Sequence, residues 1–206
     1  MTNANVNEMF DDIKSESSSF KKKKFIPIVE GEYFCKIAKV ETNIRDVKKD
    51  GNFKARVYNY TVEVMPENKQ NLYDYEDEKD DGKKCTTDGD HYVGYNFRGS
   101  VWRFLEPQKE YTFQANNAGN KGYISFCEAL GVECPKETKQ INGKDVEIHL
   151  LPNLTSDDII GKPVISVVKK GRKWKNNDGF WKQFYDSKFV RKWDRPEGEL
   201  NNDLPL

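Results

Sequence analysis

The residues best suited to chemistry in this chain are large aromatic rings interleaved with lysine and arginine. Between Lys162 and Arg195 there are eleven Lys and Arg against three Asp and Glu. Cations bind phosphates and exposed rings stack on bases, so this combination is typical of a surface that binds single-stranded nucleic acid. The seven large rings of the segment are Trp174, Phe180, Trp181, Phe184, Tyr185, Phe189 and Trp193.

Trp174 is the sharpest single candidate. Residues 169–175 are too charged to be buried, and we predict that residues 171–179 form a loop between two strands. A tryptophan there is expected to contact a ligand, with packing on its own hairpin as the alternative. Core packing is expected for at least two of the rings Tyr58, Tyr60, Tyr95 and Trp102. The predicted nucleic-acid-binding set is Arg56, Tyr58, Tyr60, Arg98, Trp102, Arg103, Lys169, Lys170, Arg172, Lys173, Trp174, Lys175, Trp181 and Lys182.

The net charge of zero is the sum of opposed segments. Residues 66–90 carry nine acidic side chains against four lysines, and residues 194–206 carry four against one arginine. A polyanion responds to the local field more than to the sum, so the basic segment remains a candidate site. The acidic tail ends in Asp203-Leu204-Pro205-Leu206, which suits a basic, apolar pocket on another protein. We predict that this tip binds partners and that the tail competes with DNA for the basic groove.

The elements that must position these residues are mostly strands. Hydrophobic patterning predicts strands at 32–40, 53–65, 91–97, 101–105, 162–170 and 180–193, with a turn at 98–100. Tyr123, Phe126, Cys127 and Leu130 recur at helical spacing within 117–131, and Gly131 suits the helix C-terminus. We predict a mainly β fold, a five-stranded Greek-key barrel with one inserted helix. The barrel domain spans 25–193 with an acidic loop insertion at 67–90, and flexible tails span 1–24 and 194–206.

Three short motifs resemble a known family. They are Gly31-Glu32-Tyr33 with Ile37, Ala129-Leu130-Gly131, and Ile160-Gly161-Lys162-Pro163-Val164. In this order they resemble small bacteriophage OB-fold proteins implicated in single-stranded-DNA binding, over roughly residues 30–193. The C-terminal tip is similar to the Asp-Ile-Pro-Phe tip of bacterial single-stranded-DNA-binding proteins, with Leu206 in place of the terminal ring.

The resemblance implies a function. It implies binding of single-stranded DNA with little sequence specificity during phage replication, recombination or repair. Replication or recombination enzymes would be recruited through the tip. We expect no cofactor and a location in the host cytoplasm.

Other classes of protein leave weaker signals. Cys85, His91, Cys127 and Cys134 would suit zinc, but their spacings match no common knuckle, and ordinary thiols are favoured. No P-loop, nucleophile elbow or HExxH pattern is present, so an enzyme is not expected. A protein-interaction β-barrel and a metal-dependent nuclease using the acidic insertion stay open as alternatives. No run approaches the roughly 20 apolar residues of a membrane span, and no secretory signal is recognisable.

Overall fold

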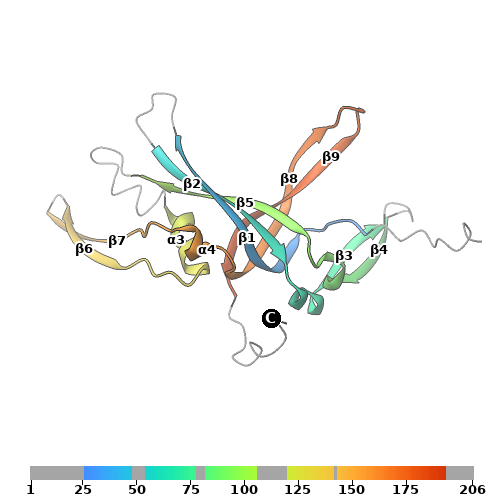
Figure 1. Ribbon diagram of the computed structural model, residues 1–206, viewed down its shortest axis with the longest axis horizontal. Helices are drawn as coiled ribbons and strands as arrows, with labels where there is room; N and C mark the ends of the chain where they lie inside the picture. Colours follow the sequence, from blue (N-terminus) through green and yellow to red (C-terminus); the bar gives the residue numbers. More distant parts are fainter. Residues whose placement is uncertain (1–25, 48–53, 78–81, 106–119, 142, 194–206) are drawn as a thin grey trace, which may run out of the picture.

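A five-stranded barrel forms the centre of the protein (Figure 1). The computed structural model describes residues 26–47, 54–77, 82–105, 120–141 and 143–193. The barrel order is β1-β2-β5-β9-β8, and every neighbouring pair is antiparallel except β5 and β9, which are parallel. The five strands are β1 (Gly31–Asp46), β2 (Lys54–Val64), β5 (Asn96–Phe104), β8 (Pro163–Lys175) and β9 (Trp181–Lys192). The predicted mainly β fold with a five-stranded closed sheet is confirmed.

Strand β1 is long because it serves two neighbours. Its first residues, 31–36, pair with β8, and residues 35–46 pair with β2. Side chains alternate along it, so Tyr33, Cys35 and Ile37 enter the core. A register shift between Ile37 and Lys39 bends the strand as it passes from one partner to the other.

The barrel closes between β5 and β9 at a single registered pair, Arg98 opposite Asp186. Gly99 makes this close approach possible. A Cβ atom on Gly99 would lie 2.4 Å from Tyr60 Cζ and 2.6 Å from the Ser187 carbonyl oxygen. Below this point the Ser187 hydroxyl lies 3.3 Å from the Tyr60 hydroxyl and accepts a hydrogen bond from Ser166 at 2.8 Å. A buried polar chain therefore links β2, β9 and β8.

Helix α3 (Lys121–Ala129) packs against the barrel core through aromatic rings. Tyr123 stacks on Tyr58 at 5.5 Å between centroids, and Phe126 stacks on Tyr60 at 5.3 Å. The predicted apolar face of this helix is confirmed, since its four predicted residues are all buried. Gly131 follows the helix at φ +74°, the left-handed conformation that glycine adopts most readily.

The described parts of the acidic insertion, 67–77 and 82–90, form regular elements, and the prediction of a loop there was wrong. Two short 3₁₀ helices, η1 (Pro66–Gln70) and η2 (Gly89–Tyr92), flank a hairpin of β3 (Leu72–Asp77) and β4 (Lys83–Asp88). The acidic residues alternate with tyrosines that are buried, Tyr73 and Tyr75. The segment thus combines an acidic outer face with an apolar inner face, a pattern that a count of charges conceals.

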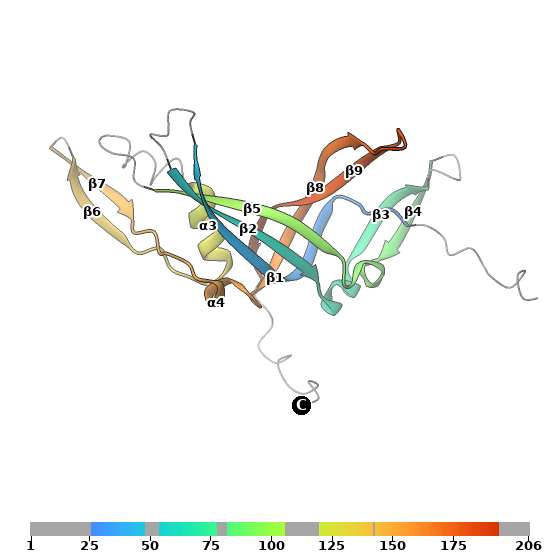
Figure 2. The same ribbon diagram turned by 45° about the horizontal axis from the view of Figure 1, so that its top comes forward.

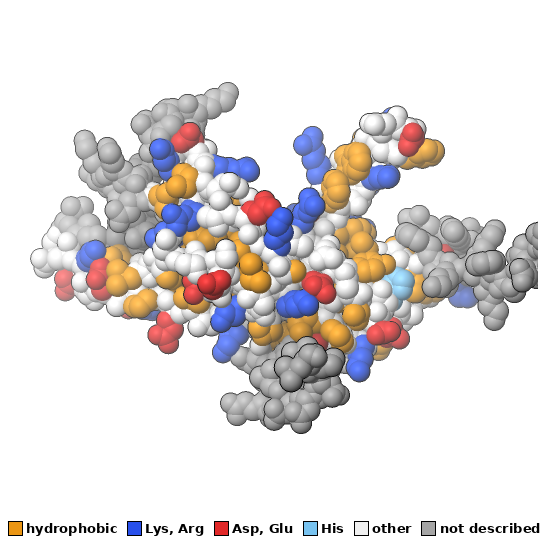
Figure 3. All heavy atoms as spheres, in the orientation of Figure 1, with side chains coloured by type: hydrophobic (Ala, Val, Ile, Leu, Met, Phe, Trp, Pro, Cys, Tyr) orange, Lys and Arg blue, Asp and Glu red, His pale blue; other side chains and the backbone are white. Residues whose placement is uncertain are grey.

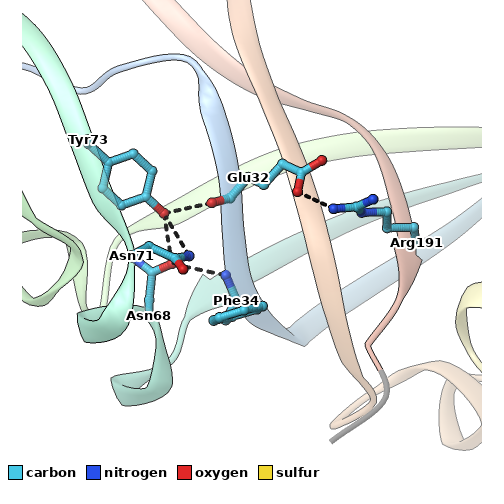
Figure 4. A network of polar contacts seen from close by, with 6 residues as sticks. All are labelled: Glu32, Phe34, Asn68, Asn71, Tyr73 and Arg191. Carbon is cyan, nitrogen blue, oxygen red and sulfur yellow. Dashed lines mark hydrogen bonds and ion pairs between the residues drawn. The ribbon is translucent and has the colours of Figure 1, made fainter.

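A buried amide fastens this insertion to the barrel (Figure 4). Asn68 Oδ1 accepts hydrogen bonds from the Phe34 backbone N–H at 3.0 Å and from Asn71 Nδ2 at 3.1 Å. The Tyr73 hydroxyl lies 2.8 Å from the same oxygen and 2.6 Å from the Glu32 carbonyl oxygen. These bonds hold η1 and β3 against the first residues of β1.

Further elements differ from the predictions. A hairpin of β6 (Lys136–Ile141) and β7 (Lys144–His149), followed by the short helix α4 (Ser156–Ile159), was not predicted. The β6–β7 and β3–β4 hairpins lie at opposite ends of the molecule (Figures 1 and 2). The predicted turn at 98–100 is wrong because β5 runs straight through it, and the predicted strand at 91–97 begins only at Asn96.

Some predictions fall outside the described part of the chain. Both predicted tails, including Asp203, Leu204, Pro205 and Leu206, lie there. Within the described ranges, no helix is long and apolar enough to cross a membrane.

We predict that Gly99→Ala lowers stability by roughly 1–3 kcal/mol, because the added methyl overpacks the β5–β9 closure. The matched control is Gly122→Ala on the exposed face of α3, where nothing lies within 4 Å of the added carbon. The control should be neutral or slightly stabilising, since alanine favours helix. Thermal unfolding measures both, and equal melting temperatures would contradict the close approach.

Candidate functional site

The outer face of β1, β2 and β5 carries polar side chains in register. Residues opposite one another on neighbouring strands share a face, so the strand pairings define rows across the sheet. Two such rows are Lys39, Thr61 and Arg98, and Glu41, Asn59 and Ser100. These rows bring together residues from three strands that are distant in sequence.

Two adjoining hollows lie on this face. One, of about 430 Å³, is bordered by Lys39, Arg45 and Arg98. The other, of about 350 Å³, shares Asn59, Arg98 and Gly99 with the first and extends to Asp186 and Lys188 on β9. Together they form one depression from β1 to β9, here called the cleft. Its residues come from β1, β2, β5 and β9, and the β1–β2 and β8–β9 strand pairs project on the same side of the barrel (Figure 1).

The cleft has an excess of positive charge. Four cations, Lys39, Arg45, Arg98 and Lys188, line it together with two carboxylates. Each carboxylate lies beside a lysine, Glu41 at 2.6 Å from Lys39 Nζ and Asp186 at 3.5 Å from Lys188 Nζ. The hydrogen bond from Lys39 holds the pKa of Glu41 below its usual value. Lys and Arg side chains gather on both hairpins and between them (Figure 3).

Trp174 lies on strand β8, and its predicted place in a loop was wrong. It pairs with Lys182 across the hairpin and stacks on Phe184, with ring centroids 5.6 Å apart and an interplanar angle of 10°. The Lys182 ammonium lies 5.9 Å from the Trp174 ring centroid. Trp174 therefore packs on its own hairpin, and 37% of its surface stays exposed.

The β8–β9 hairpin divides the predicted basic residues between two faces. Asp186 lines the cleft, and side chains alternate along a strand, so Phe184 and Lys182 continue the cleft side outward together with Trp174. Trp181 faces the other way, is 69% exposed and has Lys175 Nζ at 5.7 Å from its ring centroid. The remaining predicted cations of this hairpin are all exposed: Lys169, Lys170, Arg172 and Lys173.

The structure places three predicted residues, Arg56, Tyr58 and Arg103, away from the cleft. Tyr58 and Tyr60 are buried inside the barrel, because their parity on β2 is the inward one, and Tyr60 also borders the cleft. Arg103 Nη2 donates to the Leu151 carbonyl at 3.1 Å and so braces the chain after β7. Arg56 lies opposite Arg103 in the register. Of the early predictions, Arg98 and Trp102 remain exposed on the outer face of β5.

Sequence reasoning missed several cleft residues. Lys39, Asn59, Thr61 and Lys188 line it, and none of them was predicted. The signal for Asn59 and Thr61 was available, because they are the polar residues of β2 that alternate with buried Tyr58 and Tyr60. Lys188 was hidden by a register shift in the β8–β9 pairing.

The four candidate zinc ligands do not come together as a set. Cys85 lies on β4 and His91 on η2, whereas Cys127 lies on α3, at the other end of the barrel (Figures 1 and 2), where Cys134 is its hydrogen-bonding neighbour. No disulfide joins any of the four cysteines, and burial raises the pKa of Cys127 to about 12. Among the described residues, no group of three or more His, Cys, Asp or Glu could hold a metal ion.

Comparison with known proteins does not assign a family. No protein-family model, no curated protein and no solved structure matches this chain. The geometry and charge of the cleft and of the adjoining hairpin carry the functional argument.

Tyr60 gives a pH-dependent prediction. Burial raises its pKa to about 12, while the ordinary value of about 10 holds in the unfolded chain. Its contribution to stability is complete below pH 10 and is lost as the pH rises towards 12, by up to about 1.36 kcal/mol per pH unit. Tyr60→Phe removes the hydroxyl that faces Ser187, at a cost of about 1 kcal/mol, but cannot ionise. In urea unfolding, the gap between variant and wild type should narrow from pH 8 to pH 11, and a constant gap would contradict the burial of this hydroxyl.

Proposed function

We propose that this protein binds single-stranded DNA with little sequence preference, across the cleft and along the cleft side of the β8–β9 hairpin. One observation carries the proposal. The cations Arg98 and Lys188, here called the floor of the cleft, are followed along the β8–β9 hairpin by the stacked rings of Trp174 and Phe184. Phosphates would be neutralised on the floor, and bases would stack on the exposed ring surface. The nucleic acid must be single-stranded for its bases to reach these rings.

The barrel topology supports an OB-type assignment within this proposal. The helix lies between the third and fourth barrel strands, and the third and fifth strands, β5 and β9, pair in parallel. OB-type Greek-key barrels bind oligonucleotides on the face of their second and third strands, between the loops that connect strands 1–2 and 4–5. Here that face belongs to β2 and β5, and the two connections are the ends of the β1–β2 and β8–β9 hairpins.

Low sequence preference follows from the chemistry of the contacts. Every base has a π-face, so a ring accepts any of them, and phosphates are the same at each position. Uncharged polar residues, Asn59, Thr61 and Ser100, also line the cleft. A role in phage replication or recombination, in the cytoplasm and with enzymes recruited through Asp203–Leu206, extends the proposal from the sequence resemblance.

Titration with oligo-dT tests the proposed function. Quenching of tryptophan fluorescence by oligo-dT, with a much weaker response to a duplex of equal length, is the expected result. No response to either ligand would reject the proposal and favour a protein-interaction barrel. The same mixtures, incubated with Mg²⁺ or Mn²⁺, should leave the strand intact, because loss of the strand would indicate a nuclease.

The charge on the cleft floor gives a quantitative prediction. Arg98→Gln with Lys188→Gln should weaken oligo-dT binding and flatten the slope of log K against log salt by about 0.7 for each phosphate that is no longer neutralised. Lys69→Gln with Lys144→Gln removes the same charge from exposed positions outside the cleft and is the matched control. Equal slopes for the two double variants would mean that Arg98 and Lys188 do not contact the phosphates of the bound strand.

The two faces of the β8–β9 hairpin should differ. Trp174→Ala removes a ring on the cleft side and should cost roughly 1–3 kcal/mol of binding free energy, the range of one base stack. Trp181→Ala removes a more exposed tryptophan from the opposite face and should cost less. Fluorescence anisotropy of a labelled oligo-dT measures both. A larger loss of affinity for Trp181→Ala would mean that DNA binds the face of the hairpin that carries Trp181.

A further inference from the structure

The two strands that close the barrel separate soon after they meet. β5 and β9 share one registered pair, Arg98 with Asp186, and helix α3 packs against both strands beyond it. The helix presents two small residues at this place, Gly122 and Ser125. Because these side chains cannot fill the space between the diverging strands, a groove of about 400 Å³ remains.

Aromatic and apolar side chains line this groove. Trp102 on β5 is 36% exposed and Phe189 on β9 is 55% exposed, and Phe126 and Val190 lie deeper. Large rings that line a groove and remain exposed are a feature of ligand sites. The volume falls within the roughly 300–1,000 Å³ that small-ligand pockets occupy.

The groove is continuous with the cleft. Ser100 and Lys188 line both. Arg98, Ser100 and Trp102 alternate on the outer face of β5, so Trp102 lies about 13 Å along the strand from Arg98. A strand bound at Arg98 thus has a direct course to the rings of Trp102 and Phe189.

We propose that this groove holds one nucleobase of a DNA strand that lies in the cleft. The inference rests on the proposed function and adds to it a discrete base-binding subsite, separate from the rings of the β8–β9 hairpin. The base would be held beside Trp102 and Phe189, as extruded bases are held among aromatic and apolar side chains in other proteins. The hydroxyl groups of Ser100 and Ser125 offer hydrogen bonds to its polar edge.

Charge favours a nucleotide over an apolar peptide as the occupant. Lys188 stands at the border between groove and cleft, and Arg98 follows in the cleft. Asp186 offsets one of these charges, and Lys39 and Arg45 restore the positive excess farther along. The positive cleft favours a negatively charged group, and the adjoining groove favours an aromatic ring. A nucleotide combines the two, because its phosphate and its base are adjacent.

Gly122→Leu tests the subsite. The added side chain projects into open space and would fill the groove, while the cleft and the β8–β9 hairpin keep their residues. Thr138→Leu, on the exposed face of β6, adds the same side chain elsewhere and is the matched control. Affinities are measured for oligo-dT from 4 to 16 nucleotides, roughly the range of site sizes of single OB barrels.

The expected result is a loss that depends on oligonucleotide length. In wild type, affinity should rise by about 5- to 140-fold at the length that first reaches the groove, the range of one base stack. Gly122→Leu should lose this step and bind the shorter strands as wild type does. An oligonucleotide that lacks the base at the end that reaches the groove should bind wild type without this rise in affinity. It should bind Gly122→Leu with the same affinity as the complete oligonucleotide.

Two results would overturn the subsite. If wild type binds oligo-dT and Gly122→Leu binds every length with the same affinity, the subsite is rejected and the proposed function is kept. The groove would then be a site for a protein ligand. Absence of binding by wild type rejects the subsite together with the proposed function. Photocrosslinking of 5-iodouracil strands to unmodified protein gives an independent check. Adducts at Trp102 or Phe189 support the subsite, and adducts confined to Trp174 and Trp181 contradict it.

Discussion

The contact of β5 with β9 is the constraint on which the rest of this structure depends. Gly99 leaves space for the Tyr60 ring and the Ser187 backbone, and the one registered pair of the two strands, Arg98 with Asp186, lies next to it. Closure at this one point makes a barrel of the sheet. It also brings Arg98 beside Lys188 and starts the divergence that α3 must cover. The cleft and the groove are two outcomes of the same short contact, one on each side of it.

Aromatic residues serve three purposes here, and strand parity separates them. Tyr58 and Tyr60 point inward and stack on Tyr123 and Phe126 of α3, so they fix the helix on the barrel. Tyr33, Tyr73, Tyr92 and Phe97 form the opposite part of the core, where the insertion joins β1. In the described part of the chain, the rings that remain exposed lie on β5, β8 and β9 and, at Phe180, in the turn between β8 and β9. An unusually aromatic composition thus supports both the core and the surface.

Sequence patterns predicted the helix and the barrel strands more reliably than the contacts that their residues make with distant parts of the chain. The helix was found because its spacing is local, whereas the place of Trp174 depends on how far the β8–β9 pairing continues, which local charge does not encode. Gly99 suggested a turn but serves a close approach that involves residues far away in sequence. In the cleft, Arg98 was predicted from its type alone. Lys39 and Lys188 could not be, because only the register brings them to the same surface.

The seam between β1 and β8 has a consequence for synthesis of the chain. Across β8, Arg191 pairs with Glu32, 159 residues away in sequence, and Trp193 stacks on Phe34 at 4.6 Å. Contacts of such long range are slow to form, because a large loop must close before they contribute. During translation, the edge of β1 that later binds β8 has to wait until most of the chain has left the ribosome. Until then it offers unpaired backbone groups to neighbouring chains. Early and prolonged exposure of this edge makes β1 a site at which the unfinished chain can associate with other chains.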